Sequence, residues 1–77
     1  MEVWIVDDEK NLNQGLRMAL EGEGYDVTQA FSLGELGQLL AERFPDVVLL
    51  DVRLPDGDGI SALPSILRAR RMEGRAE

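Results

Sequence analysis

A chain of 77 residues is long enough for one small domain. It contains no cysteine and no histidine, which excludes disulfides, thiolate metal sites, the usual zinc ligands and nucleophiles that need a histidine base. The formal net charge of −7 argues against direct binding to nucleic acid. No basic leader followed by a long apolar segment is present. We therefore expect no signal peptide, no membrane span and a cytoplasmic location.

The first half of the chain predicts a strand, a helix and a second strand. The first strand, residues 2–7, contains four consecutive apolar residues. A helix follows over residues 10–22, where leucines recur at helical spacing, and Asp8 or Asn11 is a candidate for its N-cap. Apolar and polar residues then alternate over residues 25–30, which is typical of a strand with one exposed face.

The second half predicts the same alternation. Ser32 and Glu35 have the spacing of a capping box at the start of a helix over residues 33–44. The third strand is expected over residues 46–51, and a loop rich in turn-forming residues follows it. A third helix is expected over residues 60–72.

The third helix has two unusual features. Pro64 must occupy its first turn, because a proline further inside would kink it. Four arginines fall within the last ten residues, where they complement the helix dipole or form an interaction tail. These are Arg68, Arg70, Arg71 and Arg75.

The order β-α-β-α-β-α predicts an α/β domain over residues 1–77, in which helices cover a parallel sheet. Asp7 and Asp8 follow the first strand, and Asp51 follows the third. Each alone is a weak signal, because acidic residues also cap helices and form turns. If the two strands are neighbours, the three carboxylates meet at one edge of the sheet. Clustered carboxylates repel one another, so this edge would suit a hard cation such as Mg²⁺.

Two segments of the chain resemble the receiver domain of two-component response regulators. They are Val6-Asp7-Asp8-Glu9 and the stretch from Asp51 to Gly59, which is close to the family form Asp-x-x-Leu-Pro-Asp-x-x-Gly. The resemblance covers essentially the whole chain. It implies an incomplete flavodoxin-like (CheY-like) three-layer sandwich with strand order 2-1-3.

The resemblance also implies roles for individual residues. Asp51 would be the phosphoacceptor, which takes phosphate from a sensor histidine kinase or a histidine phosphotransfer domain. Asp8 would bind Mg²⁺ directly and Asp7 through water, with Asp51 and the backbone carbonyl of Arg53 as further ligands. Gly59 would shape the loop by adopting backbone angles that other residues avoid.

The sequence departs from the family pattern in its length. The family domain has five strands, of which the fourth carries a Ser or Thr and the fifth a Lys at the phosphoryl site. Neither has a counterpart here, and the only lysine, Lys10, lies elsewhere. We therefore expect a truncated receiver that is impaired in switching. Its third strand would be an exposed edge, so the isolated chain should be poorly stable or form a homodimer or strand-swapped oligomer.

Two other functions remain open. The chain could be a non-signalling binding module that docks a kinase or another receiver through its first helix, with Asn11, Asn13, Gln14 and Arg17 facing outward. It could also be a Mg²⁺-dependent phosphohydrolase that uses Asp51, although no general acid or base is positioned for that reaction. We therefore expect a phosphoacceptor and not an enzyme.

Overall fold

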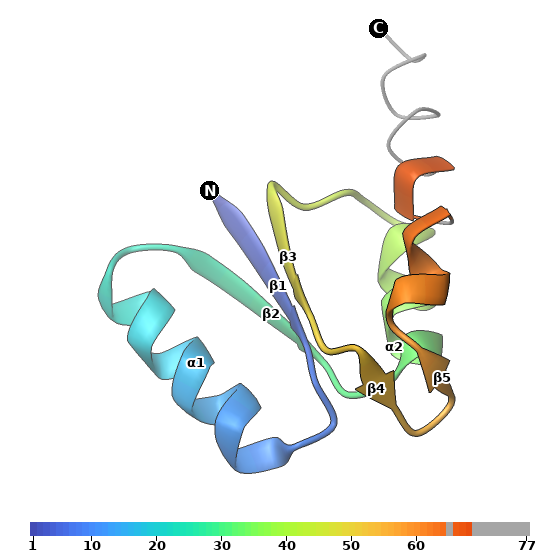
Figure 1. The fold of residues 1–77 in the computed structure, drawn as a ribbon. Coiled ribbons are helices and arrows are strands. Elements are labelled where there is room, and N and C mark those ends of the chain that lie inside the picture. Colours follow the sequence, from blue (N-terminus) through green and yellow to red (C-terminus); the bar gives the residue numbers. More distant parts are fainter. Residues whose placement is uncertain (65, 69–77) are drawn as a thin grey trace, which may run out of the picture.

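The computed structural model describes residues 1–64 and 66–68 (Figure 1). Three strands and two helices alternate as the sequence predicts, and a small hairpin and a short 3₁₀ helix follow them. None of the helices formed by these residues is long and apolar enough to cross a bilayer. In chain order the elements are β1 (Glu2–Val6), α1 (Lys10–Gly22), β2 (Asp26–Ala30), α2 (Leu33–Leu40), β3 (Val47–Leu50), β4 (Arg53–Leu54), β5 (Gly57–Asp58) and η1 (Ile60–Ala62).

The three long strands form a parallel sheet in the order β2-β1-β3, which confirms the predicted fold class. At the carboxyl end of the sheet, Val6 of β1 lies opposite Ala30 of β2 and Leu50 of β3. Helix α1 covers one face of the sheet, and α2 lies on the other with the segment around η1 (Figure 1). The result is a three-layer α/β arrangement with β1 in the centre of its sheet.

The hydrophobic core lies between the sheet and α2. Trp4 and Val6 point to this side from β1 and are fully buried, as is Ala30 at the end of β2. Leu36 of α2 and Ile66 close the core from the other side. Because side chains alternate along a strand, Ile5 points to the opposite face, where α1 lies, and it too is buried. Burial on both faces explains why β1 is a continuous apolar run.

Both long helices differ from prediction at one end. The N-cap of α1 is Glu9, not Asp8 or Asn11, and its carboxylate accepts hydrogen bonds from the backbone N–H groups of Asn11 and Leu12 at 3.2 and 2.7 Å. The prediction that α2 extends to residue 44 was wrong, because the helix ends at Leu40.

The early end of α2 has a physical cause in the residues that follow it. Pro45 disfavours helical angles in the residue before it, so the last turn of a longer helix would be strained. The chain turns instead, and Arg43 reaches the amino-terminal edge of the sheet. Its Nε atom lies 2.8 Å from Oε2 of Glu2, and its guanidinium group lies 5.7 Å from the centre of the Trp4 ring. This ion pair and cation–π contact fix the connection from α2 to β3.

The third helix begins as predicted, with η1, and residues 63–64 and 66–68 are helical. Pro64 is therefore in the first α-helical turn, as required, while residues 69–72 of the predicted helix lie outside the described part of the chain.

The loop before the third helix contains the unpredicted β4–β5 hairpin, in which Arg53 pairs with Asp58. Gly57 in this hairpin has a φ of +154°, and a Cβ atom there would lie only 2.8 Å from Cδ1 of Leu33. The hairpin can pack this closely on α2 because the residue is a glycine.

Asp56, at the turn of the hairpin, binds the amino terminus of α2. Its carboxylate accepts hydrogen bonds from the backbone N–H groups of Leu33 and Gly34, both at 2.8 Å. These two bonds lower the pKa of Asp56. Ser32 provides the predicted cap, since its Oγ accepts a bond from the N–H of Glu35. The first turn of α2 is thus held by its own cap and by the hairpin.

We expect the hydrogen bonds of Asp56 to make the stability of the fold depend on pH. Since the pKa of Asp56 is lowered in the folded state, its contribution is fully present above the ordinary Asp value of about 3.9 and is lost as the pH falls through the lowered value. Asp56→Asn should therefore lower Tm by a few degrees at pH 7 and by less at pH 3. Thermal unfolding followed by circular dichroism would measure this. Asp26→Asn, an exposed position at the start of β2, is the charge-matched control, and an equal loss for Asp56→Asn at both pH values would contradict the expectation.

Candidate metal centre at the end of β1 and β3

The sheet places the three predicted acidic residues at one edge. Asp7 and Asp8 directly follow β1, and Asp51 directly follows β3. The strand ladder continues into these residues, because the N–H of Asp51 donates to the carbonyl of Val6 at 2.9 Å and the N–H of Asp7 donates to the carbonyl of Ala30 at 3.0 Å. The backbones of Asp7 and Asp51 are therefore fixed by the sheet and not by a loop alone.

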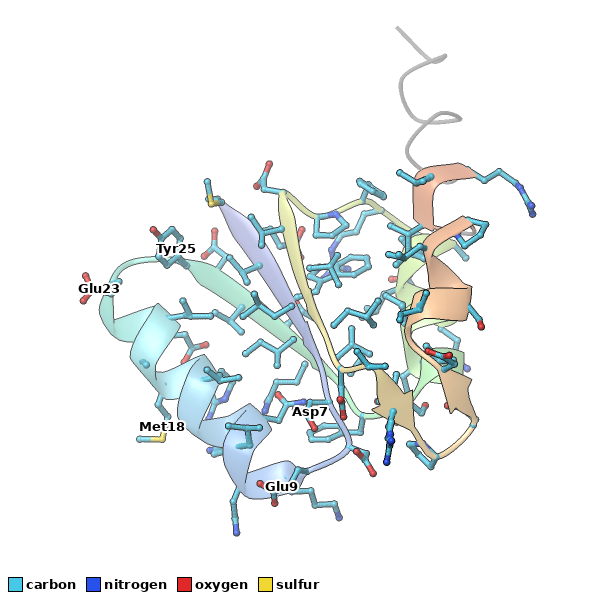
Figure 2. The ribbon with its side chains drawn as sticks, in the orientation of Figure 1. Asp7, Glu9, Met18, Glu23 and Tyr25 are labelled. Atoms are coloured by element: carbon cyan, nitrogen blue, oxygen red, sulfur yellow. The ribbon has the colours of Figure 1, made fainter. Side chains whose placement is uncertain are left out.

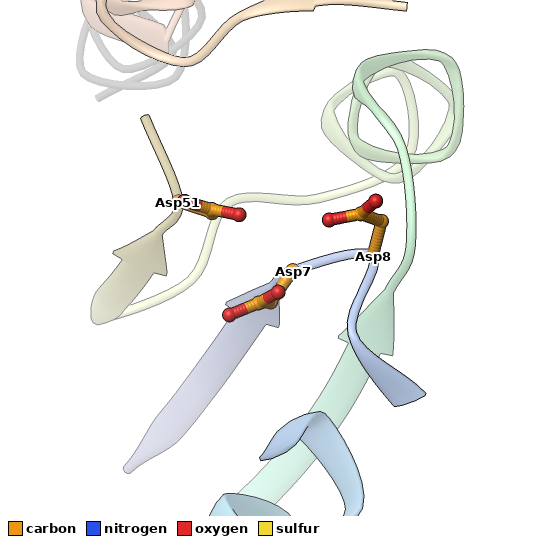
Figure 3. A group of neighbouring side chains, drawn as sticks. All are labelled: Asp7, Asp8 and Asp51. Carbon is orange, nitrogen blue, oxygen red and sulfur yellow. The ribbon is translucent and has the colours of Figure 1, made fainter. Parts of the chain in front are cut away.

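The three carboxylates lie close together. One oxygen from each lies within 4.8 Å of the others, and in Figure 3 the side chains of Asp8 and Asp51 extend toward each other. Two ligands on opposite sides of a Mg²⁺ ion are about 4.2 Å apart, twice the usual Mg–O distance of about 2.1 Å. The all-oxygen donor set and its spacing thus fit a magnesium ion after small side-chain rotations. Without a cation, each pair of charges at this distance repels by about 1 kcal/mol even in water.

Hydrogen bonds orient two of the carboxylates. Oδ1 of Asp7 accepts a bond from the N–H of Glu9 at 2.9 Å, and Oδ1 of Asp51 accepts one from the N–H of Arg53 at 3.3 Å. Asp7 and Asp51 are half-buried, whereas Asp8 is exposed. The exposed Asp8 leaves the cluster open to an ion or ligand from solvent. Whether the carbonyl oxygen of Arg53 is a further ligand stays a prediction.

A small cavity adjoins the cluster. It has a volume of about 270 Å³ and is lined by Asp7 and Asp51 together with Ile5, Leu16 and Leu49, among others. A larger cavity of about 480 Å³ lies between α2 and the β4–β5 hairpin, but none of the three carboxylates lines it. The smaller cavity thus contacts two of the three carboxylates, and the exposed Asp8 lies outside it.

Gly59 has a different role from the predicted one. Its φ and ψ of −58° and −34° are ordinary right-handed values, so the expectation of unusual backbone angles was wrong. A Cβ atom at this position would instead overlap the backbone carbonyl oxygen of Asp51. The N–H of Gly59 also donates to the carbonyl of Val52 at 2.7 Å. A glycine is needed because the loop passes directly against the backbone of Asp51.

Sequence reasoning placed Asn13 wrongly on the outer surface of α1. The residue is completely buried, and its side-chain amide donates to the carbonyl oxygens of Asp7 and Ala30. A signal was present in the sequence, because Asn13, Leu16 and Leu20 share one helix face at spacings of three and four residues. Leu12 was among the leucines whose helical spacing predicted the buried face of this helix, and it is 50% exposed.

Known proteins match this chain over almost all of its length. Residues 3–75 match the model of the response regulator receiver domain. The chain is 42% identical to the KDP operon transcriptional regulatory protein KdpE of Escherichia coli over 80 aligned residues, which cover 92% of this chain and 36% of that protein.

Solved structures agree with the sequence comparison. A receiver domain protein (CheY-like) from Methanospirillum hungatei superimposes with a TM-score of 0.86 at 31% identity, over 91% of this chain and 56% of that one. The response regulator TrrA from Thermotoga maritima, solved in complex with Mg²⁺ and BeF, gives a TM-score of 0.83 at 27% identity, over 91% of this chain and 61% of that one. The chain thus spans little more than half of these structures and about a third of KdpE. With a family match across almost all of its residues and the same fold, the chain belongs to the response regulator receiver domain family.

Proposed function

We propose that this chain is a phosphoacceptor of two-component signal transduction, in which Asp51 takes a phosphoryl group from a sensor histidine kinase or a histidine phosphotransfer domain. The observation that supports this most strongly is the convergence of Asp7, Asp8 and Asp51, whose oxygens lie within 4.8 Å of one another at the carboxyl edge of the sheet. Asp8 and Asp51 would bind Mg²⁺ directly, Asp7 through water, and the carbonyl of Arg53 would complete the protein ligands.

The proposed reaction transfers a phosphoryl group between two nucleophiles. A carboxylate oxygen of Asp51 forms a bond to phosphorus while the N–P bond of the phosphohistidine breaks, and the released imidazole nitrogen takes a proton from solvent. The N–H of Arg53 holds Oδ1 of Asp51, which leaves Oδ2 to attack. Bound Mg²⁺ would supply the positive charge that lets an anionic carboxylate approach an anionic phosphoryl group. The response regulator TrrA, which has the same fold, was solved in complex with Mg²⁺ and BeF, and this supports Mg²⁺ as the ion.

We expect the isolated chain to form a phosphoryl adduct on Asp51. Incubation with acetyl phosphate and Mg²⁺ should increase the intact mass by one phosphoryl group, and Asp51→Asn should abolish the increase because the amide is not a nucleophile. The rate should be low, since loss of one preorganised donor can cost on the order of 10²–10³ and the 77 residues hold no counterpart of the family's Ser/Thr and Lys. Asp26→Asn, at the opposite edge of the sheet, is the matched control.

A folded sample that forms no adduct would contradict the phosphoacceptor function and favour the non-signalling binding module. The exposed Leu12 and Met18 of α1 would then be candidate docking residues.

Removal of one ligand should weaken Mg²⁺ binding. Loss of a residue that only orients a metal ligand typically costs about 10–100-fold in affinity, so Asp8→Asn should cost at least about tenfold. Isothermal titration calorimetry with MgCl₂ would measure this against Asp26→Asn, which removes the same charge far from the cluster. Equal affinities for the two variants would show that the ion responds to net charge and not to this site.

We also propose that two copies of the isolated chain pair through β3. Within the described residues β3 is an edge of the sheet, and Val47 and Leu49 are each 39% exposed on the α1 side. An apolar edge strand with free backbone groups is a template for association.

Size-exclusion chromatography with light scattering should therefore show a dimer for the isolated chain. Val47→Lys should shift it toward monomer, because a lysine on an edge strand opposes pairing. Met18→Lys, which adds the same charge at an exposed position of α1 outside β3, is the control. A compact wild-type monomer that unfolds cooperatively would contradict the proposal.

A further inference from the structure

Asn13 is unusual because it is the only polar residue that is fully buried within residues 1–64 and 66–68. It lies in the first turn of α1, where its backbone N–H donates to the carbonyl of Glu9. The rest of the buried set is apolar. A polar side chain in such a position is costly unless its hydrogen-bonding groups are satisfied, so its partners indicate why it is there.

The side chain of Asn13 satisfies all of its donors at the site edge. Its Nδ2 group donates to the carbonyl oxygen of Asp7 at 2.8 Å and to that of Ala30 at 3.1 Å. Its Oδ1 atom accepts a bond from Nε2 of Gln29 at 3.0 Å. A primary amide has two N–H donors, and both are directed at the carboxyl ends of β1 and β2.

The bond to Asp7 acts on the geometry of the acidic cluster. A peptide unit is planar, so fixing the carbonyl oxygen of Asp7 also fixes the N–H and the Cα of Asp8. The direction of the Asp8 side chain, which extends toward Asp51 in Figure 3, depends on this plane. In Figure 2, α1 runs beside the strand that leads to the labelled Asp7, which allows a residue of its first turn to reach this peptide.

We infer that Asn13 is a positioning residue of the metal centre, which holds the Asp7–Asp8 peptide so that both carboxylates face Asp51. The inference rests on the proposed function, since it assigns Asn13 a role only if the cluster binds Mg²⁺. Glu9 secures the same turn from its other end, because its N–H binds Oδ1 of Asp7 while its carboxylate caps α1. Asn13 differs from Glu9 in that it is shielded from solvent, so its bonds to the backbone do not compete with water.

The inference can be tested by Mg²⁺ titration calorimetry of the wild type, Asn13→Leu and Asn13→Ser. Leucine keeps the approximate volume and removes both donors, while serine keeps one hydroxyl donor. We expect Asn13→Leu to weaken Mg²⁺ binding by about 10–100-fold and Asn13→Ser by less. Val3→Ala, a buried position at the opposite end of β1, controls for loss of stability and should leave the affinity of the folded protein unchanged.

A second measurement does not depend on a variant that folds. In the wild type, the side-chain N–H₂ resonances of Asn13 should exchange slowly with water and shift during a Mg²⁺ titration, over the concentration range in which calorimetry shows binding. Resonances that do not move while the ion binds would overturn the role of Asn13, as would equal Mg²⁺ affinities for the wild type and Asn13→Leu. A folded wild type that binds no Mg²⁺ would overturn the proposed function and this inference together.

Discussion

The parallel pairing of β1 with β3 is the constraint on which the rest of the structure depends. It places Val6 opposite Leu50, and the next bond of the ladder joins the N–H of Asp51 to the carbonyl of Val6. A slip of one residue would turn Val48 and Leu50 away from the core cluster that they now pack against. The hydrophobic core therefore fixes the register, and the register fixes the separation of the carboxylates. The same packing that stabilises the sheet therefore also sets the geometry of the site.

The loop after Asp51 is held by a second set of contacts. Gly59 passes against the backbone of Asp51, the N–H of Ile60 donates to Oδ1 of Asp58, and Asp56 binds the first turn of α2. Backbone groups take part in all of these contacts, so they fix the course of the loop more firmly than contacts between flexible side chains would. The phosphoacceptor candidate is thus connected to α2 through the hairpin as well as through the sheet. A displacement of the hairpin would therefore shift both the backbone near Asp51 and the first turn of α2.

The parts of this fold that were predictable from sequence are those governed by local pattern. Two apolar runs and one alternating segment predicted the strands, and the strand order implied by the family resemblance placed Asp7 and Asp51 at one edge of the sheet. The β4–β5 hairpin was not predicted because its strands contain two residues each and are stabilised by packing on α2. The connection after α2 is held by Arg43, whose partner Glu2 is 41 residues away in the chain and could not be read from local pattern.

Asn13 shows a different limit of sequence reasoning. Leucine at position 12 outweighed asparagine at position 13 in the choice of the buried face of α1, because apolar residues are the usual guide to that choice. The hydrogen-bond acceptors that make burial of Asn13 possible are the carbonyl ends of two other strands, which no local pattern reveals.

The places where this chain departs from local rules lie at one edge of its sheet. Three carboxylates gather where repulsion opposes them, a glycine is required by a close backbone approach, and an amide is buried in an apolar layer. Repulsion among the carboxylates costs stability on its own, and a domain of 77 residues has little stability to spare. Such costs persist when the residues act as a unit, as binding of a cation and an anionic ligand requires. The amino-terminal edge of the same sheet shows the contrast, because there Glu2 is paired with Arg43 and the charges offset each other. The negative charge at the carboxyl edge has no such protein partner among the described residues, and the proposed Mg²⁺ would offset it.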